Sequence, residues 1–180
     1  MKSKVLIDDL IARTKEHLTK VETLNTKALE ELNWKPSAER WSVLECVEHL
    51  NLYGDFYIPE FNRRLENNNT APQEIFKAGM LGEYFAKSML PKEKLNKMKT
   101  FADKNPNGSE LTTFAIERLS GQLTDMLAIL ERARGVSLTK TKCSISISKL
   151  IKLNLGDTLR VVIYHNERHL LQAKNVLAEK

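Results

Sequence analysis

The chain has 180 residues, of which 42% are hydrophobic and 28% are charged, and its formal net charge is +5. This length and apolar fraction predict one compact domain over residues 1–180 and leave little room for two. The positive charge is mostly interleaved with Asp and Glu. The densest basic run, over residues 92–104, is interrupted by Glu93 and Asp103 and carries only Phe101 as an aromatic residue. We therefore expect no nucleic-acid partner.

The N-terminal segment and the cysteines indicate a cytoplasmic protein. Residues 1–18 contain only a short apolar run at 5–7, which predicts neither a signal peptide nor a membrane-spanning helix. Cys46, in a helical pattern, and Cys143, in a loop-like stretch, form no metal motif and no disulfide framework. We expect no membrane partner.

Helical periodicity dominates the first third of the chain. Apolar residues recur at spacings of three, four and seven over residues 3–23, which predicts a first long helix, and a shorter helix is predicted over 27–32. Pro36 then breaks the pattern, since it fixes its own φ and restricts the preceding residue. Ser42 and Glu45 have the spacing of a capping box. A second long helix is therefore predicted to begin at Val43 and to end by residues 67–72.

The middle of the chain is less regular. Glycines and prolines divide residues 73–108 into short amphipathic pieces, so we expect loop with partial helix there. A third long helix is predicted from about Ser109 to near Gly135, because leucines and other apolar residues again follow a helical stripe.

The last segment combines an extended run with a helix. Residues 144–148 alternate Ser and Ile, which is locally typical of a strand, but one such run has no evident partner. We therefore expect residues 136–155 to form an ordered crossing loop and not a sheet. Asp157 is predicted to be the N-cap of a final helix that ends near Ala178. Four long helices predict an all-α four-helix bundle.

Three of the four histidines lie where two helices of such a bundle could meet. His165 and His169 are one turn apart on the final helix, where Cβ atoms are roughly 5–6 Å apart, and His49 lies near the start of the second. All three border apolar stripes, whereas His17 lies on a polar stretch. Three imidazoles and a water complete the shell of a catalytic divalent ion. A core-edge role for His49 and a surface coincidence for the pair remain the alternatives.

The residues around this candidate site are assigned by their spacing. Glu45 and Tyr53 lie one turn on either side of His49, and either could orient a ligand, although helix capping is the favoured role of Glu45 and core packing that of Tyr53. Gln172 follows His169 by one turn and could bond a ligand or substrate. Tyr53 and Gln172 are therefore the candidate substrate-binding residues, and no catalytic residue is assigned.

Two segments resemble a known family. The segment that contains Trp41, Ser42, Glu45, His49 and Leu50 resembles the KWS-x-x-E-x-x-x-HL motif of the DinB-like (YfiT-type) metalloproteins. The final helix resembles their H-x-x-RH-x-x-Q motif, with His165, Arg168, His169 and Gln172 in its fixed positions. The motifs occur in the family's order, and the likeness in layout covers nearly the whole chain.

The resemblance implies a bundle with up-down-down-up connectivity, often paired as a homodimer, in which His49, His165 and His169 are the metal ligands. The family includes S-transferases and isomerases that use bacillithiol, mycothiol or glutathione. Three neutral imidazoles leave the +2 charge of an ion uncompensated, which lowers the pKa of a bound thiol or water.

We therefore expect a thiol S-transferase, or a related hydrolase, that acts on a small-molecule thiol and an electrophile. Imidazole accepts zinc, nickel, copper and iron, and zinc or nickel is the expected ion. The alternative is a non-enzymatic, stress-related dimer with a structural metal site.

Overall fold

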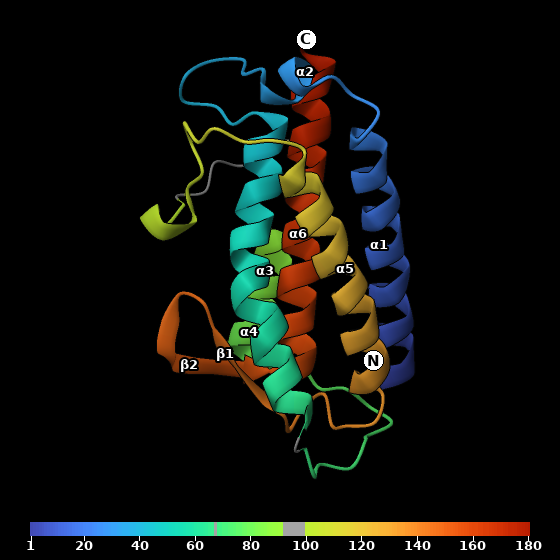
Figure 1. The fold of residues 1–180 in the computed structure, drawn as a ribbon. Helices are drawn as coiled ribbons and strands as arrows, with labels where there is room; N and C mark the ends of the chain where they lie inside the picture. Colours follow the sequence, from blue (N-terminus) through green and yellow to red (C-terminus); the bar gives the residue numbers. More distant parts are fainter. Residues whose placement is uncertain (67, 92–99) are drawn as a thin grey trace.

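The computed structural model describes residues 1–66, 68–91 and 100–180. Within these ranges the long helices are α1 (Ser3–Leu24), α3 (Val43–Glu66), α5 (Phe114–Ala133) and α6 (Leu155–Ala178). In Figure 1, α1 and α6 run in one direction and α3 and α5 in the other. The chain is therefore the expected all-α bundle with up-down-down-up connectivity.

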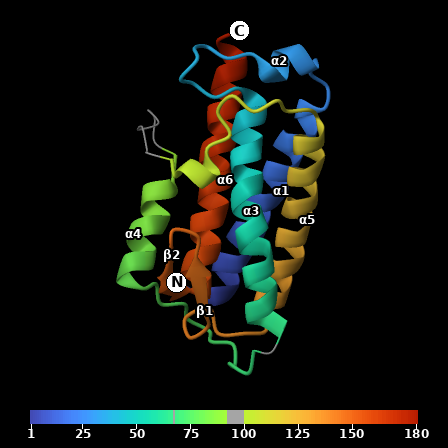
Figure 2. The ribbon, with the colours of Figure 1, turned by 60° about the vertical axis from the view of Figure 1, so that its left-hand side comes forward.

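The bundle core lies between the pair α1 and α3 and the pair α5 and α6. α1 and α3 each pack against both α5 and α6, and apolar side chains of all four helices are buried between them. Burying such a side chain contributes about 1.5–3 kcal/mol. The short helix α4 (Met80–Met89) packs against α6 on the outside of the bundle, as Figure 2 shows. No described helix is both long and apolar enough to cross a membrane.

The beginning of α3 confirms the predicted capping box. The Glu45 amide donates to Ser42 Oγ at 3.1 Å, and the Ser42 amide donates to Glu45 Oε2 at 2.7 Å. Two amides that a helix leaves unpaired in its first turn are thereby satisfied. The predicted short helix before it is also present, as α2 (Leu29–Asn33). Cys46, in the first turn of α3, and Cys143 are both buried and free.

The region predicted as loop with partial helix contains α4 and the 3-10 turn η1 (Ala102–Lys104). The basic run at 92–99, and residue 67 at the predicted end of the second helix, lie outside the described residues. The predicted start of the third helix is wrong, because α5 begins at Phe114 and not near Ser109. The Leu111 carbonyl accepts a bond from Asn33 Nδ2 at 3.1 Å, so this segment is tied to α2 instead of opening a helix.

The expectation of a crossing loop without a sheet is also wrong. Strands β1 (Lys142–Ile145) and β2 (Ser148–Asn154) form an antiparallel hairpin, with Cys143 opposite Leu153 and an irregularity between Ser144 and Ile145. The partner strand is the continuation of the same segment. Side chains of α3 complete the hairpin, since Glu60 Oε1 accepts the Ser144 amide at 2.7 Å. Such a contact between distant segments leaves no local trace in the sequence.

The predicted N-cap of the last helix is likewise wrong. α6 begins at Leu155 after Asn154, and Asp157 lies within its first turn. The Asp157 side chain is fully buried and accepts the Gly79 amide at 2.8 Å, with Arg160 Nη1 at 3.4 Å. A carboxylate in the first turn still complements the helix dipole. Asp157 thus joins the segment that precedes α4 to α6 instead of capping its own helix.

A glycine on α3 allows close contact with α5 and leads to a first prediction. A Cβ atom at Gly54 would lie 2.0 Å from Gln122 Oε1, and Gln122 Nε2 donates to the Asn51 carbonyl and to Asp55 Oδ1. Gly54→Ala gains about 1 kcal/mol of helix propensity but displaces two bonds worth about 0.5–1.5 kcal/mol each. We expect a net loss of about 1 kcal/mol in the free energy of unfolding, measured by urea denaturation.

The matched control removes the Gln122 side chain that a Cβ atom at position 54 would meet. In a Gln122→Ala background the same Gly54→Ala change should stabilise the protein by about 1 kcal/mol, because only the propensity gain remains. An effect of the same sign in both backgrounds would contradict this account of the contact.

Candidate metal centre

The structure brings together the three histidines that the sequence singled out. His49 comes from α3 and His165 and His169 from α6, and one ring nitrogen of each lies within 4.8 Å of the others. His49 Nε2 and His165 Nε2 are 3.2 Å apart. Nitrogens that bind a tetrahedral ion at about 2.0–2.1 Å are about 3.3 Å from one another. The three rings therefore have the composition and spacing to hold a divalent ion.

Hydrogen bonds fix which nitrogen of two of these rings faces the centre. His49 Nδ1 donates to the Lys104 carbonyl at 2.7 Å, and His169 Nδ1 donates to Gln172 Oε1 at 3.0 Å. Because carbonyl and amide oxygens only accept, both Nδ1 atoms carry the proton and both Nε2 atoms keep a lone pair. Bonds of this kind orient metal-binding histidines and raise their basicity.

Burial keeps the rings neutral. It is the main cause that lowers the pKa of His49 to about 4; the bond to the Lys104 carbonyl raises this pKa, and the Lys104 charge lowers it. Burial, followed by repulsion from the neighbouring histidines, places the pKa values of His165 and His169 well below the ordinary range. At neutral pH all three imidazoles are thus uncharged, which is the form that binds a cation.

Two aromatic side chains flank the histidines. The Trp41 ring centroid lies 4.6 Å from that of His49 and 5.7 Å from that of His169. Tyr53 lies 5.0 Å from His49 and 4.7 Å from His165. Trp41 precedes α3, and Tyr53 follows His49 by one turn. The two rings therefore contact the imidazoles from both sides of His49 along the chain.

The candidate substrate-binding residues border the cluster. Gln172 is bonded to His169, and burial raises the pKa of Tyr53 to about 12, so its hydroxyl stays a hydrogen-bond donor at neutral pH. Contact of either residue with a substrate stays a prediction.

The sequence did not indicate the Lys104 carbonyl as a partner of His49, since a residue of any type supplies a carbonyl. The role of Trp41 could have been found, because it lies within the motif of the second helix.

The polar position expected for His17 is wrong. Its side chain is buried in α1, apart from the other three histidines, and its Nδ1 has no hydrogen-bond partner among the described residues. His17 occupies the buried stripe of α1 together with Leu10, Thr14 and Val21. Charged neighbours in the sequence point outward from the same helix turn.

The comparison with known families supports the same reading. The family model of the DinB superfamily matches residues 8–173, which include all three clustered histidines. The comparisons with curated proteins and with solved structures returned no match. With a helical bundle and a family match over most of its length, the chain belongs to the DinB superfamily.

Proposed function

We propose that the protein is a metal-dependent enzyme in which His49, His165 and His169 hold one divalent transition-metal ion, with zinc or nickel the expected metal. The observation that carries this proposal is the convergence of one ring nitrogen from each of the three imidazoles. In two of them, His49 and His169, the Nδ1 proton is bonded outward and the Nε2 lone pair is left free. The described residues add no fourth His, Cys, Asp or Glu to this group. Structural zinc sites usually close with four protein ligands, whereas catalytic sites keep one position open.

The finer proposal is transfer of a small thiol to an electrophile. A divalent ion at the three nitrogens would supply a positive charge that favours the anionic form of a thiol or a water. In the transfer, the thiol sulfur bonds to the electrophilic carbon, the leaving group departs with its electron pair, and the thiol proton passes to solvent. Bacillithiol, mycothiol and glutathione are the candidate thiols, and hydrolysis is the related reaction in which water takes the same place.

The side chains around the three histidines would orient the imidazoles and the substrate. Trp41 and Tyr53 pack against the imidazoles, and Tyr53 can donate a hydrogen bond from its neutral hydroxyl to the substrate. Gln172 keeps the proton of His169 on Nδ1. A homodimer and a cytoplasmic location stay predictions.

The enzymatic role is tested with small thiols and a chromogenic electrophile. Metal-loaded protein should consume the electrophile with at least one thiol, and the rate should disappear on chelation and return when the ion is restored. His165→Ala should show no such rate, because it lacks one ligand. If the ion stays bound but no thiol gives a metal-dependent rate, the alternative of a structural ion in a non-enzymatic protein is favoured.

A further inference from the structure

One of the imidazoles is oriented by a distant loop instead of by its own helix. His169 is held by Gln172, three residues further along α6, whereas His49 is held by the Lys104 carbonyl, 55 residues away. The orientation of His49 therefore depends on whatever keeps the loop over residues 104–108, here named the His49 loop, in place.

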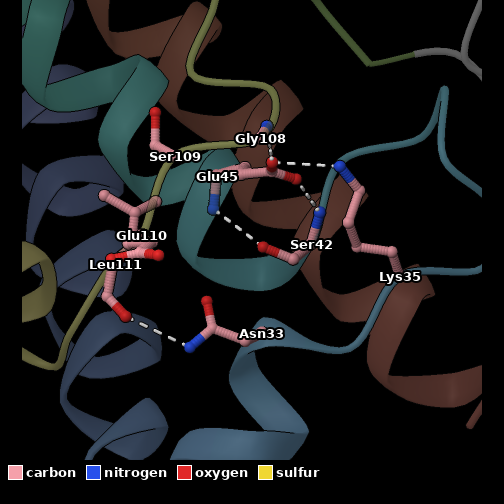
Figure 3. Close-up of a pocket in the computed structure, with 8 residues that line it drawn as sticks. All are labelled: Asn33, Lys35, Ser42, Glu45, Gly108, Ser109, Glu110 and Leu111. Carbon is pink, nitrogen blue, oxygen red and sulfur yellow. Dashed lines mark hydrogen bonds and ion pairs between the residues drawn. The ribbon is translucent and has the colours of Figure 1, made fainter.

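The far end of the His49 loop is bound to Glu45. Gly108 N donates to Glu45 Oε1 at 2.6 Å, and Lys35 Nζ lies 3.0 Å from the same oxygen, while Oε2 accepts the Ser42 amide (Figure 3). Glu45 is 2% exposed and forms part of the wall of a surface pocket of about 340 Å³. All these donors converge on one buried carboxylate.

The two contacts between α3 and the His49 loop are four residues apart on both segments. Glu45 precedes His49 by one turn of α3, which rises about 6 Å over four residues. Gly108 follows Lys104 by four residues, so the loop runs along α3 in the opposite direction and contacts it at both ends. Next to Lys104, Asn105 Oδ1 also holds the loop by accepting Trp41 Nε1 at 3.1 Å. Gly108 has a φ of +81°, a conformation that other residues rarely adopt.

We propose that Glu45 is a positioning residue for the metal centre: by holding Gly108 it keeps the Lys104 carbonyl on His49 Nδ1. This role rests on the proposed metal site and goes beyond helix capping, because the Glu45 oxygen that bonds Gly108 is not the one that caps the helix. Loss of an outer partner of a metal-binding histidine typically weakens metal affinity about 10- to 100-fold.

Three variants separate positioning from capping. Glu45→Ala removes both roles, and Gly108→Pro removes the amide donor and cannot adopt the φ of the loop, yet leaves the capping box intact. Ser42→Ala removes one capping bond and leaves the loop contact in place. The dissociation constant of Co²⁺ or Zn²⁺ is measured for each metal-free protein by competition with a chromophoric chelator, after circular dichroism has established that the variant is folded.

We expect Gly108→Pro and Glu45→Ala to weaken ion binding about 10- to 100-fold, and Ser42→Ala to stay within about threefold of the unmodified protein. A second readout is the Nδ1 proton of His49 in NMR spectra, which should exchange with solvent faster in Gly108→Pro while that of His169 stays protected. If Glu45→Ala fails to fold, Gly108→Pro decides the question.

The two possible failures are distinguishable. If the unmodified protein binds no ion, the proposed metal site fails. If it binds an ion and folded Gly108→Pro keeps the same affinity, or if Ser42→Ala loses as much affinity as Glu45→Ala, the positioning role of Glu45 is overturned and the metal site stands.

Discussion

His165→Ala should abolish tight binding of a divalent ion, while the unmodified protein should bind about one ion per chain. His165 Nε2 lies 3.2 Å from His49 Nε2, so the substitution removes one of the three nitrogens that would coordinate the ion. We expect the loss of affinity to exceed the about 10- to 100-fold typical of an outer partner. Metal analysis of the purified proteins and chelator competition measure both quantities.

Two other variants give this experiment a graded control. Gln172→Ala removes the acceptor of His169 Nδ1 but no ligand, so its affinity should fall between that of the unmodified protein and that of His165→Ala. His17→Leu changes a buried histidine outside the cluster and should keep the unmodified affinity.

Thermal stability supplies an independent readout of the same prediction. A ligand that binds only the folded state at 100 times its dissociation constant stabilises it by about 2.7 kcal/mol. Added Zn²⁺ should therefore raise the Tm of the unmodified protein and of His17→Leu, but not that of His165→Ala. Stoichiometric ion retention by folded His165→Ala would show that these three histidines are not the ligand set.

Local signals in the sequence sufficed for much of the bundle and for two of the three histidine positions. Apolar periodicity predicts α1, α3 and α6 because each helix buries one stripe, and the spacing of Ser42 and Glu45 marks the start of α3 through bonds made within one turn. His165 and His169 are neighbours by helix geometry alone. Joining them to His49 required the bundle, whose helix order the family resemblance implied.

Features that depend on contacts between distant segments could not be predicted in the same way. The hairpin is completed by Glu60 of α3, and the start of α5 is displaced by a bond from Asn33. Lys104 acts through its carbonyl, which carries no residue-specific signal. The capping box correctly predicted one role of Glu45, but its bond to Gly108 depends on a loop more than 60 residues away.

His17 is a different case, because its burial was within reach of the sequence. Leu10, Thr14, His17, Val21 and Leu24 follow one another at spacings of four and three, which is the buried stripe of α1. The charged residues next to His17 suggested a polar position, although neighbours in sequence point to different sides of a helix. Periodicity is therefore better evidence for burial than the polarity of adjacent residues.

The burial of His17 predicts a loss of stability in mild acid. Burial, together with the nearby Lys20 charge, lowers the pKa of His17 from an ordinary value near 6.5 to about 4. Between these two values the unfolded chain binds a proton that the folded chain does not. The stabilising contribution of the neutral ring is therefore complete above about pH 6.5 and falls as the pH decreases toward 4. From pH 7 to pH 4.5 this amounts to about 2 kcal/mol.

A comparison with His17→Leu isolates this contribution. Leucine fills a similar volume and does not titrate, and both proteins retain the three clustered histidines, whose own titration in this range cancels in the comparison. Urea denaturation at pH 7 and pH 4.5, with metal removed from both proteins, should show that the unmodified protein loses about 2 kcal/mol more than the variant. Equal losses would mean that His17 is protonated within the folded bundle, which requires a water or an acceptor at its Nδ1.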